Sequence, residues 1–288
     1  MNSENAQPRA MSCAQLELLL RARGFHFVKS LGQNFLMDEE RLAFIAERSG
    51  ATGRAVLEIG AGAGCLTKAL APLAERVLAI EIDRNLIPIL ETVLSPFQNV
   101  KILQGDALRL KLEPLCAKEL GEGFIVAANL PYGITSEIML RLFALRGAES
   151  ITVLLQKEAI ERILCGPGSR EYGPISILRE YFFESEILGE IGPESFLPEP
   201  SVTSSILRLV RREGGEPCQE EALRDLLRAA FAARRKTLHN NLSPLLGREG
   251  AAEAIQGAGL PAGIRAEAVP LDSFLLLCGE IAKLPPHV

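Results

Sequence analysis

Short apolar runs alternate with helix-like segments through most of this 288-residue chain, and this alternation limits the possible folds more than any other feature. The runs predict strands at 55–59, 77–82, 100–103, 123–128 and 151–156. The segments that follow them predict helices at 65–74, 84–94, 135–145 and 157–165. Strands that are apolar throughout and separated by helices are typical of a parallel sheet with both faces covered. We therefore predict an α/β fold.

The two ends of the chain depart from this alternation. A helix over 13–23 comes first, and another begins at Asp38, whose carboxylate can cap its N-terminus. Residues 184–191 and 204–210 predict two strands at the sheet edge, and the stretch 192–202 between them is too rich in proline for regular structure. After the Gly-rich stretch 213–217 the pattern predicts only helices, at 220–233, 236–246, 251–258 and 271–282.

These elements predict two domains, as the length of the chain also suggests. We expect an α/β domain over residues 1–212, with an N-terminal extension over 1–37. A small all-α domain is expected over 218–288.

Composition excludes several classes of protein. With 48% hydrophobic and 23% charged residues, wholesale disorder is excluded, and no apolar run approaches the roughly 18 residues of a membrane span. Six cysteines and three histidines are scattered without a CxxC pair, which argues against disulfides and metal sites. The N-terminus has no secretory pattern. We expect a cytoplasmic protein with reduced thiols, no metal and no membrane partner.

Basic residues gather in two stretches of a chain whose net charge is −5. Residues 18–37 hold three basic residues and no acid, and 224–248 hold six basic residues against one acid, including Arg234, Arg235 and Lys236. Two basic stretches on an acidic body can form a footprint for nucleic acid. Charge alone still favours the simpler reading that they are solvated helix faces.

A glycine-rich loop joins the first predicted strand to a helix in the pattern Glu58-x-Gly60-x-Gly62-x-Gly64. Glycines at such a turn let the backbone approach a ligand closely. The next strand carries an acid near its end, Glu81, whose carboxylate can accept hydrogen bonds from ribose hydroxyls. This spacing fits nucleoside-binding methyltransferases better than dehydrogenases. The alternative is a tight turn with Glu81 on the surface.

Two further polar elements follow strands of the same predicted sheet. Asp106 comes after the third strand and could accept from an adenine amino group, although a turn cap is the simpler reading. The fourth strand ends in Asn129-Leu130-Pro131-Tyr132. The Asn129 side-chain oxygen and the Leu130 carbonyl can accept the two hydrogens of an adenine amine, and Pro131 restricts Leu130. Tyr132 offers a face on which a base can stack.

With these motifs the chain resembles the ribosomal RNA adenine dimethyltransferases (the KsgA/RsmA family). The resemblance covers nearly the full length and rests on nine motifs: 30–36 (SLGQNFL), 58–64 (EIGAGAG), 81–83 (EID), 106–107 (DA), 129–132 (NLPY), 156–158 (QKE), 172–173 (YG), 196–202 (FLPEPSV) and 234–242 (RRKTLHNNL). It implies a Rossmann-like class I methyltransferase sheet, a small helical RNA-binding domain and S-adenosylmethionine as cofactor.

The family also implies roles for matched positions. Those that would bind the cofactor are Asn34, Leu36, Gly60, Gly62, Glu81, Asp106 and Asn129. In this assignment Asn34 and Leu36 cover the methionine end, Glu81 holds the ribose and Asp106 holds the adenine ring. The catalytic positions would be Asn129, Leu130, Pro131 and Tyr132. Phe196 would stack on the flipped base opposite Tyr132, and Arg234, Arg235 and Lys236 would contact RNA phosphates.

The implied substrate is a pair of adjacent adenines in the 3′-terminal hairpin loop of 16S ribosomal RNA, each dimethylated at N6 within a nearly mature small subunit. We expect a monomer. Two positions depart from the family pattern: Ala128 stands where Gly is common, and His239 stands where Arg is common. The second departure removes one phosphate contact.

Three other functions remain open on the sequence. A large-subunit adenine methyltransferase of the antibiotic-resistance type shares the catalytic domain, but the helical tail favours the small-subunit enzymes. An assembly factor without catalysis is disfavoured by the retained Glu81, Asp106 and Asn129. A nicotinamide-dependent dehydrogenase is disfavoured by the spacing of the glycine loop.

Overall fold

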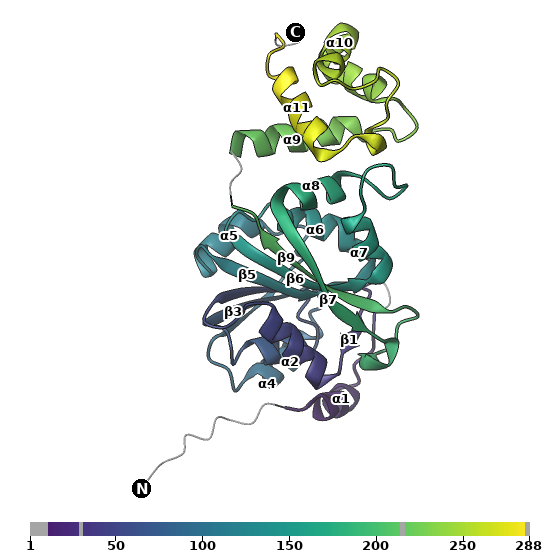
Figure 1. Ribbon diagram of the computed structural model, residues 1–288. Coiled ribbons are helices and arrows are strands. Elements are labelled where there is room, and N and C mark those ends of the chain that lie inside the picture. The colour runs from purple at the N-terminus through teal and green to yellow at the C-terminus, as the bar shows by residue number, and fades with distance from the viewer. Residues whose placement is uncertain (1–10, 29–30, 214–216, 286–288) are drawn as a thin grey trace. The chain divides into compact units, whose positions relative to one another are not determined.

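The computed structural model describes residues 11–28, 31–213 and 217–285, except the side chains of Tyr132, Pro217 and Cys218. The chain forms two compact units (Figure 1). The α/β unit comprises Met1–Ile160 and Ser185–Arg211, and the helical unit comprises Glu161–Glu184 and Arg212–Val288. The expected boundary at residue 212 therefore needs a correction, because residues 161–184 belong with the helical tail and not with the sheet.

The α/β unit is built on a seven-stranded sheet with strand order β4-β3-β2-β5-β6-β9-β7. Five strands are parallel and confirm the predicted runs: β2 (Ala55–Ile59), β3 (Arg76–Glu81), β4 (Val100–Gln104), β5 (Phe124–Asn129) and β6 (Ala148–Gln156). The edge also agrees with expectation, because β9 (Ser204–Arg211) pairs antiparallel with β6 and β7 (Phe183–Ile191) lies beyond it.

Helices cover both faces of this sheet. Figure 1 shows α2 (Glu39–Arg48) and α4 (Ile87–Leu94) on one face, with α5 (Leu112–Glu119) and α6 (Thr135–Phe143) on the other. On the first face α2 and α4 pack against α3 (Cys65–Leu70), and α4 also packs against α1 (Cys13–Ala22). All five residues of β2 are buried, as expected for a central strand covered on both sides. The Asp38 side chain caps α2, as predicted, by accepting from the N–H of Arg41 at 3.1 Å.

A second, two-stranded sheet joins distant parts of the chain. It pairs β1 (Phe35–Leu36) antiparallel with β8 (Phe196–Leu197). The proline-rich stretch 192–202 is therefore not wholly irregular as predicted, since it contains β8 and the short helix η3 (Pro193–Ser195). Both Phe35 and Phe196 are buried, and their burial stabilises a pairing that no local pattern reveals.

The helical unit contains α8 (Pro174–Phe182), α9 (Pro217–Ala230), α10 (Leu238–Gly257) and α11 (Leu271–Ile281). The helix α7 (Lys157–Leu164) runs across the division between the units. At Gly247 φ is 72°, which is not helical, and this kink divides α10 into two segments. The two shorter helices predicted at 236–246 and 251–258 correspond to these segments. Within the described ranges, no helix combines the length and the apolar character needed to cross a membrane.

Hydrogen bonds to main-chain carbonyl groups attach residues 161–184 to the helical tail. The Tyr172 hydroxyl donates to the Val269 carbonyl at 3.1 Å, and the Gly168 N–H donates to the Glu267 carbonyl at 2.8 Å. Tyr172 is buried, so this contact replaces water that the hydroxyl would otherwise bind. These bonds give the physical reason for the corrected boundary.

Asn241, in the predicted motif 234–242, has a structural role. Its buried Nδ2 donates to the carbonyl oxygens of Ala230 at 2.6 Å and Ala233 at 3.1 Å, at and just beyond the end of α9. Helix C-termini leave carbonyl groups without intrahelical partners, so this side chain satisfies groups that α9 cannot satisfy itself.

Asn241→Ala should destabilise the helical unit. It leaves the Ala230 carbonyl without its donor, while the Ala233 carbonyl keeps the Lys236 N–H, and one such buried loss costs about 1–3 kcal/mol. Urea unfolding followed by circular dichroism measures the loss. The neighbouring Asn240→Ala is the matched control, because Asn240 is exposed and only its main-chain N–H is used, by the Thr237 cap. Equal stability of the two variants would contradict the assignment.

Candidate active site

The candidate site lies where the carboxyl ends of β2, β3 and β5 meet. Two cavities, a smaller and a larger one, open there and share Phe35, Gly60, Gly62 and Asn129 in their walls. The strand order reverses its direction between β2 and β5, since β3 and β4 lie on one side and β6 on the other. Open α/β sheets bind their ligands at such a switch point.

The glycine loop forms one wall of both cavities. Gly60, Gly62 and Gly64 have φ values of 73°, 59° and 87°, in the left-handed region that favours glycine. A Cβ atom at Gly62 would also lie 2.9 Å from Cε1 of Phe35, so the ring of Phe35 packs directly on the loop. The loop therefore approaches Phe35, in the N-terminal segment of the chain, closely, and its approach to a ligand stays a prediction.

Glu81 is buried at the end of β3 and lines the larger cavity. Its Oε2 accepts from the Gly62 N–H at 2.7 Å and its Oε1 accepts from the Asp83 N–H at 2.8 Å. Burial raises the pKa of Glu81, and these main-chain N–H groups oppose that rise. Each oxygen keeps a lone pair for a further donor. The alternative of a surface Glu81 is wrong.

Asn129 ends β5 and lies in the walls of both cavities. Its Nδ2 donates to the Asn34 carbonyl at 2.9 Å. A carbonyl can accept only from the NH₂ side of an amide, so this bond fixes which atom of Asn129 is oxygen. Over the described part of the chain, no donor is found on Asn129 Oδ1. The side chain therefore has one hydrogen-bond acceptor to offer.

The next residues of the tetrapeptide also line the larger cavity, namely Leu130 and Pro131. The Leu130 side chain is buried and its N–H donates to the Leu154 carbonyl at 3.2 Å. Pro131 has φ −60° and ψ 138° and is followed by the short helix η2 (Tyr132–Ile134). The Tyr132 side chain, which the sequence predicts to stack on a base, lies outside the described atoms.

The two cavities thus bring Asn129 together with five other residues of the cofactor site that the resemblance implies: Asn34, Leu36, Gly60, Gly62 and Glu81. The structure does not bring every predicted residue to these walls.

Asp106 is absent from both cavity linings. Its Oδ1 accepts from the Leu108 N–H at 2.9 Å and its Oδ2 lies 3.3 Å from Arg109 Nε. The simpler reading, a carboxylate that caps a turn, describes its present contacts.

Phe196 does not have the geometry that base stacking requires. Its side chain is only 5% exposed and belongs to the hydrophobic core, against β1. A ring that is buried in the core presents no free face to a flipped base, so the expected role of Phe196 is corrected to a packing role in this structure.

Among the residues of the site that were not predicted, Gln33 and Ile82 have a clear role in its geometry. Gln33, directly before Asn34, donates through Nε2 to Asp83 Oδ2 at 2.8 Å. Ile82 lines the larger cavity although it is 46% exposed, so it offers an apolar face there. The signals were present in the motifs 30–36 and 81–83, but the residue types alone do not specify that these segments touch.

Glu58 lies under the glycine loop, fully buried, and lines the smaller cavity. Burial raises the pKa of Glu58 to about 8; the Thr67 hydroxyl opposes the rise and the charge of Glu81 adds to it. At neutral pH this carboxyl is therefore mostly protonated.

Arg234, Arg235 and Lys236 lie in the turn between α9 and α10, although Lys236 was predicted to begin a helix. The helix starts later because the Thr237 side chain caps it. All three side chains are exposed, and none forms an ion pair with any part of the chain that the structure describes. Arg234 donates to the Arg170 carbonyl. His239, the departure from the family pattern, is hydrogen-bonded through Nε2 to the Arg248 carbonyl.

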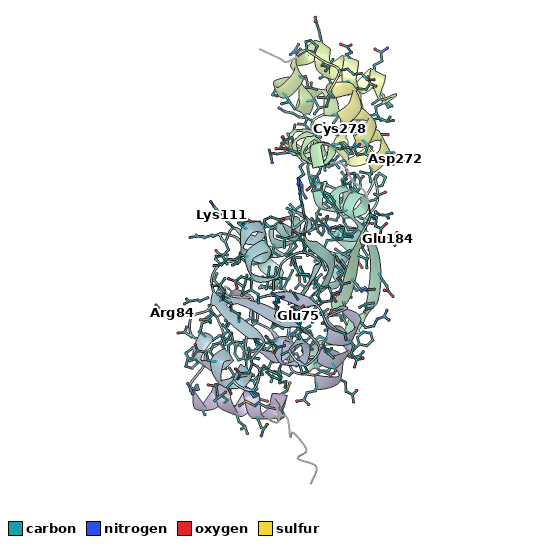
Figure 2. The ribbon with its side chains drawn as sticks, turned by 90° about the vertical axis from the view of Figure 1, so that its left-hand side faces the viewer. Glu75, Arg84, Lys111, Glu184, Asp272 and Cys278 are labelled. Atoms are coloured by element: carbon teal, nitrogen blue, oxygen red, sulfur yellow. The ribbon has the colours of Figure 1, made fainter. Side chains whose placement is uncertain are left out.

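Cations also project from the α/β unit. Figure 2 shows the side chains of Arg84 and Lys111 extending outward, the first from the loop after β3 and the second from the residue before α5.

Among residues that the structure describes, no three histidine, cysteine or acidic side chains come together in a group that could hold a metal ion.

Glu58→Gln should change how stability depends on pH. The folded pKa is about 8 and the unfolded pKa is about 4.3, so between these values the folded protein holds one proton more. Its stability therefore falls as pH rises, by about 1.4 kcal/mol per unit. The variant lacks this loss, so its stability relative to that of the wild type should increase from roughly pH 5 to roughly pH 8.

Urea unfolding at several pH values measures this difference. Glu47→Gln on the exposed face of α2 is the matched control and should follow the wild type. A Glu58→Gln difference that stays constant with pH would rule out a protonated Glu58.

Comparison with known proteins agrees with this geometry. The family model of ribosomal RNA adenine dimethylase matches residues 24–283. Ribosomal RNA small subunit methyltransferase A of Shouchella clausii is 42% identical over 270 residues, covering 92% of this chain and 90% of the relative. The protein of the same name from Lachnoclostridium phytofermentans is 41% identical, covering 92% and 95%.

Two solved structures have the same fold. The 23S rRNA methyltransferase ErmE has a TM-score of 0.63 and 28% identity, covering 86% of this chain and all of that chain. A dimethyladenosine transferase from Plasmodium falciparum has a TM-score of 0.72 and 25% identity, covering 86% and 98%. The sheet is that of the class I methyltransferases, and the chain belongs to the ribosomal RNA adenine dimethylase family.

Proposed function

We propose that this enzyme transfers methyl groups from S-adenosylmethionine to N6 of two adjacent adenines in the 3′-terminal hairpin loop of 16S ribosomal RNA, giving two dimethylated adenines. Relatives that match over most of their length are named ribosomal RNA small subunit methyltransferase A, which supports the small-subunit substrate. The proposed substrate form is a nearly mature small subunit, and the protein acts as a monomer in the cytoplasm.

The residues around the two cavities fit a nucleoside with a methionine tail. The glycine loop supplies Gly60 and Gly62 to the walls of both cavities, with main chain and no side chain. Glu81 can accept from ribose hydroxyls, and Ile82 offers an apolar face to the flat base. Asn34 lines the same cavity as Glu81, and Leu36 lines the smaller one. S-adenosylmethionine, when bound, supplies a methyl group that its sulfonium already activates.

Asp106 keeps a proposed role in holding the adenine ring of the cofactor. Its carboxylate caps a turn just after β4, and 29% of its side chain is exposed. Its second oxygen faces only Arg109, an exposed cation that can move aside.

The protein promotes methyl transfer to the adenine amine by aligning that amine. The amine is planar and its lone pair is delocalised into the ring, so it is a poor nucleophile. Acceptors at Asn129 Oδ1 and the Leu130 carbonyl would bind its hydrogens and direct the lone pair at the methyl carbon. As the new bond forms, the nitrogen becomes acidic and loses a proton to water or through Asn129.

A second methylation limits this picture, because a monomethylated amine has only one N–H left. We infer that only one of the two acceptors is used in the second step. The pocket must then hold a methyl group where the first hydrogen was.

One observation carries the proposal: the Asn34 carbonyl takes the NH₂ side of Asn129, which leaves Oδ1 as the acceptor at the edge of the cavities. An amide in the opposite orientation would offer a donor to the amine and would oppose the reaction.

The direct test uses small subunits isolated from cells that lack this methylation. The subunits are incubated with S-adenosylmethionine and the protein, and modified adenines are mapped by mass spectrometry. Two neighbouring dimethylated adenines near the 3′ end are expected. Modification of large-subunit RNA instead would favour the alternative substrate, and absence of any methylation would reject the function.

Asn129→Ala should lower methyl transfer by about a hundredfold or more, because the acceptor that aligns the amine is lost. Cofactor binding should remain measurable by calorimetry, since Glu81 and the glycine loop are unchanged. Thermal unfolding controls for a general loss of structure. Activity close to that of the wild type would contradict the role of the tetrapeptide.

Changing Arg234, Arg235 and Lys236 together to Glu should weaken RNA binding and flatten its dependence on salt, because fewer phosphate contacts release fewer counterions. A filter-binding series over salt concentration measures the slope. The matched control changes Arg76, Lys101 and Lys118 to Glu, which alters the net charge equally at exposed positions of the α/β unit. The same slope in both variants would argue against specific contacts by the turn.

A further inference from the structure

Gln33 links two segments of the chain, and none of the roles proposed above uses it. Its Oε1 accepts from the Val28 N–H at 2.8 Å, and its Nε2 donates to Asp83 Oδ2 at 2.8 Å. Asp83 is buried, and its other oxygen accepts from the Asn85 N–H at 2.9 Å. Gln33 therefore joins the N-terminal segment to the loop that follows β3.

The residues after Gln33 are fixed on their other side as well. Phe35 and Leu36 pair with β8, and the ring of Phe35 packs on Gly62. Asn34 lies between these two attachments, and its carbonyl is the acceptor that orients Asn129. The Asn34 side chain cannot hold that carbonyl in place, because its Nδ2 bonds only to the Gly32 carbonyl at 3.3 Å.

We propose that Gln33 is a positioning residue for methyl transfer: by bridging Val28 and Asp83 it holds the Asn34 carbonyl, and through that carbonyl it keeps Asn129 Oδ1 directed at the target amine. This inference rests on the proposed function, but the hydrogen bonds that it uses are present in the protein without substrate. Gln33 itself lies in the wall of the larger cavity and is not required to touch the reacting atoms.

The two side chains allow a test by exchange of polarity. In Gln33→Glu two carboxylates face each other, and in Asp83→Asn two NH₂ groups face each other, so each single change breaks the bridge. In the double variant, the carboxylate at position 33 can accept both from the Val28 N–H and from the new amide at position 83. That amide keeps an oxygen for the Asn85 N–H, so every bond is restored with the same shape and net charge.

Each single change should lower kcat by about tenfold to a hundredfold, because a small displacement of an aligning group has effects of that size. The KM for undermethylated small subunits and the affinity for S-adenosylmethionine should change little. The double variant should recover kcat to within about threefold of the wild type, as expected for a directly interacting pair. Gln98→Glu, an exposed position before β4, controls for the added charge and should match the wild type.

A second readout does not need activity. The side-chain NH₂ resonances of Asn129, identified by their loss in Asn129→Asp, report the hydrogen bond to Asn34. They should move toward the positions of exposed amides in both single variants and return in the double variant. This measurement separates failure of the inference from failure of the proposed function, because it succeeds even if the wild type does not methylate the RNA.

Three results would overturn the proposal. The first is single variants with unchanged kcat and unchanged Asn129 resonances. The second is a double variant that stays as impaired as the single ones, which would mean that Asp83 acts through its neighbour Glu81 and not through Gln33. The third is loss of cofactor affinity and thermal stability in proportion to kcat, which would assign Gln33 a merely structural role.

Discussion

The buried carboxylate of Glu81 is the contact on which the rest of the site depends. A carboxylate removed from water must find hydrogen-bond donors, and here it takes the main-chain N–H groups of Gly62 and Asp83. One of these donors follows β2 and the other follows β3, so the carboxylate ties the two loops together. With the glycine loop held in this way, Phe35 has a fixed surface to pack on and the cavities have a rigid wall.

The site is shared among segments that are far apart in sequence. The parallel order of β3, β2 and β5 brings their carboxyl ends together, and the segment around Asn34 and Phe35 closes over them. Each neighbour supplies a main-chain group: Gly62 and Asp83 donate to Glu81, and Asn34 accepts from Asn129. Main-chain groups move less than side chains, so the functional side chains are held by the most rigid parts of their surroundings. Such an arrangement suits a reaction in which alignment carries most of the effect.

Local signals explain what the sequence could predict. Apolar runs marked the five parallel strands because a central strand is buried on both faces, and Asp38 marked the start of α2 because a carboxylate at that position satisfies free N–H groups. The spacing of Gly60, Gly62 and Gly64 marked the loop because their backbone angles suit glycine.

The rest depends on contacts between distant residues. Nothing near Phe196 reveals that it pairs with Leu36, so its ring was assigned to a base when it belongs to the core. The link between Gln33 and Asp83 joins residues fifty positions apart. Residues 161–184 look like a continuation of the α/β pattern, and contacts with the tail, such as the bonds of Gly168 and Tyr172, assign them elsewhere.

The pairing of β1 with β8 also bears on how the enzyme is made. These strands are separated by about 160 residues, and β1 has no other strand partner in the sheets described. While the chain is being synthesised, β1 must wait for Phe196 and Leu197 to leave the ribosome before it can take its final position. The central sheet strands β2 to β6 are complete earlier, so the pocket at their carboxyl ends is finished late in translation, after most of its supporting scaffold exists.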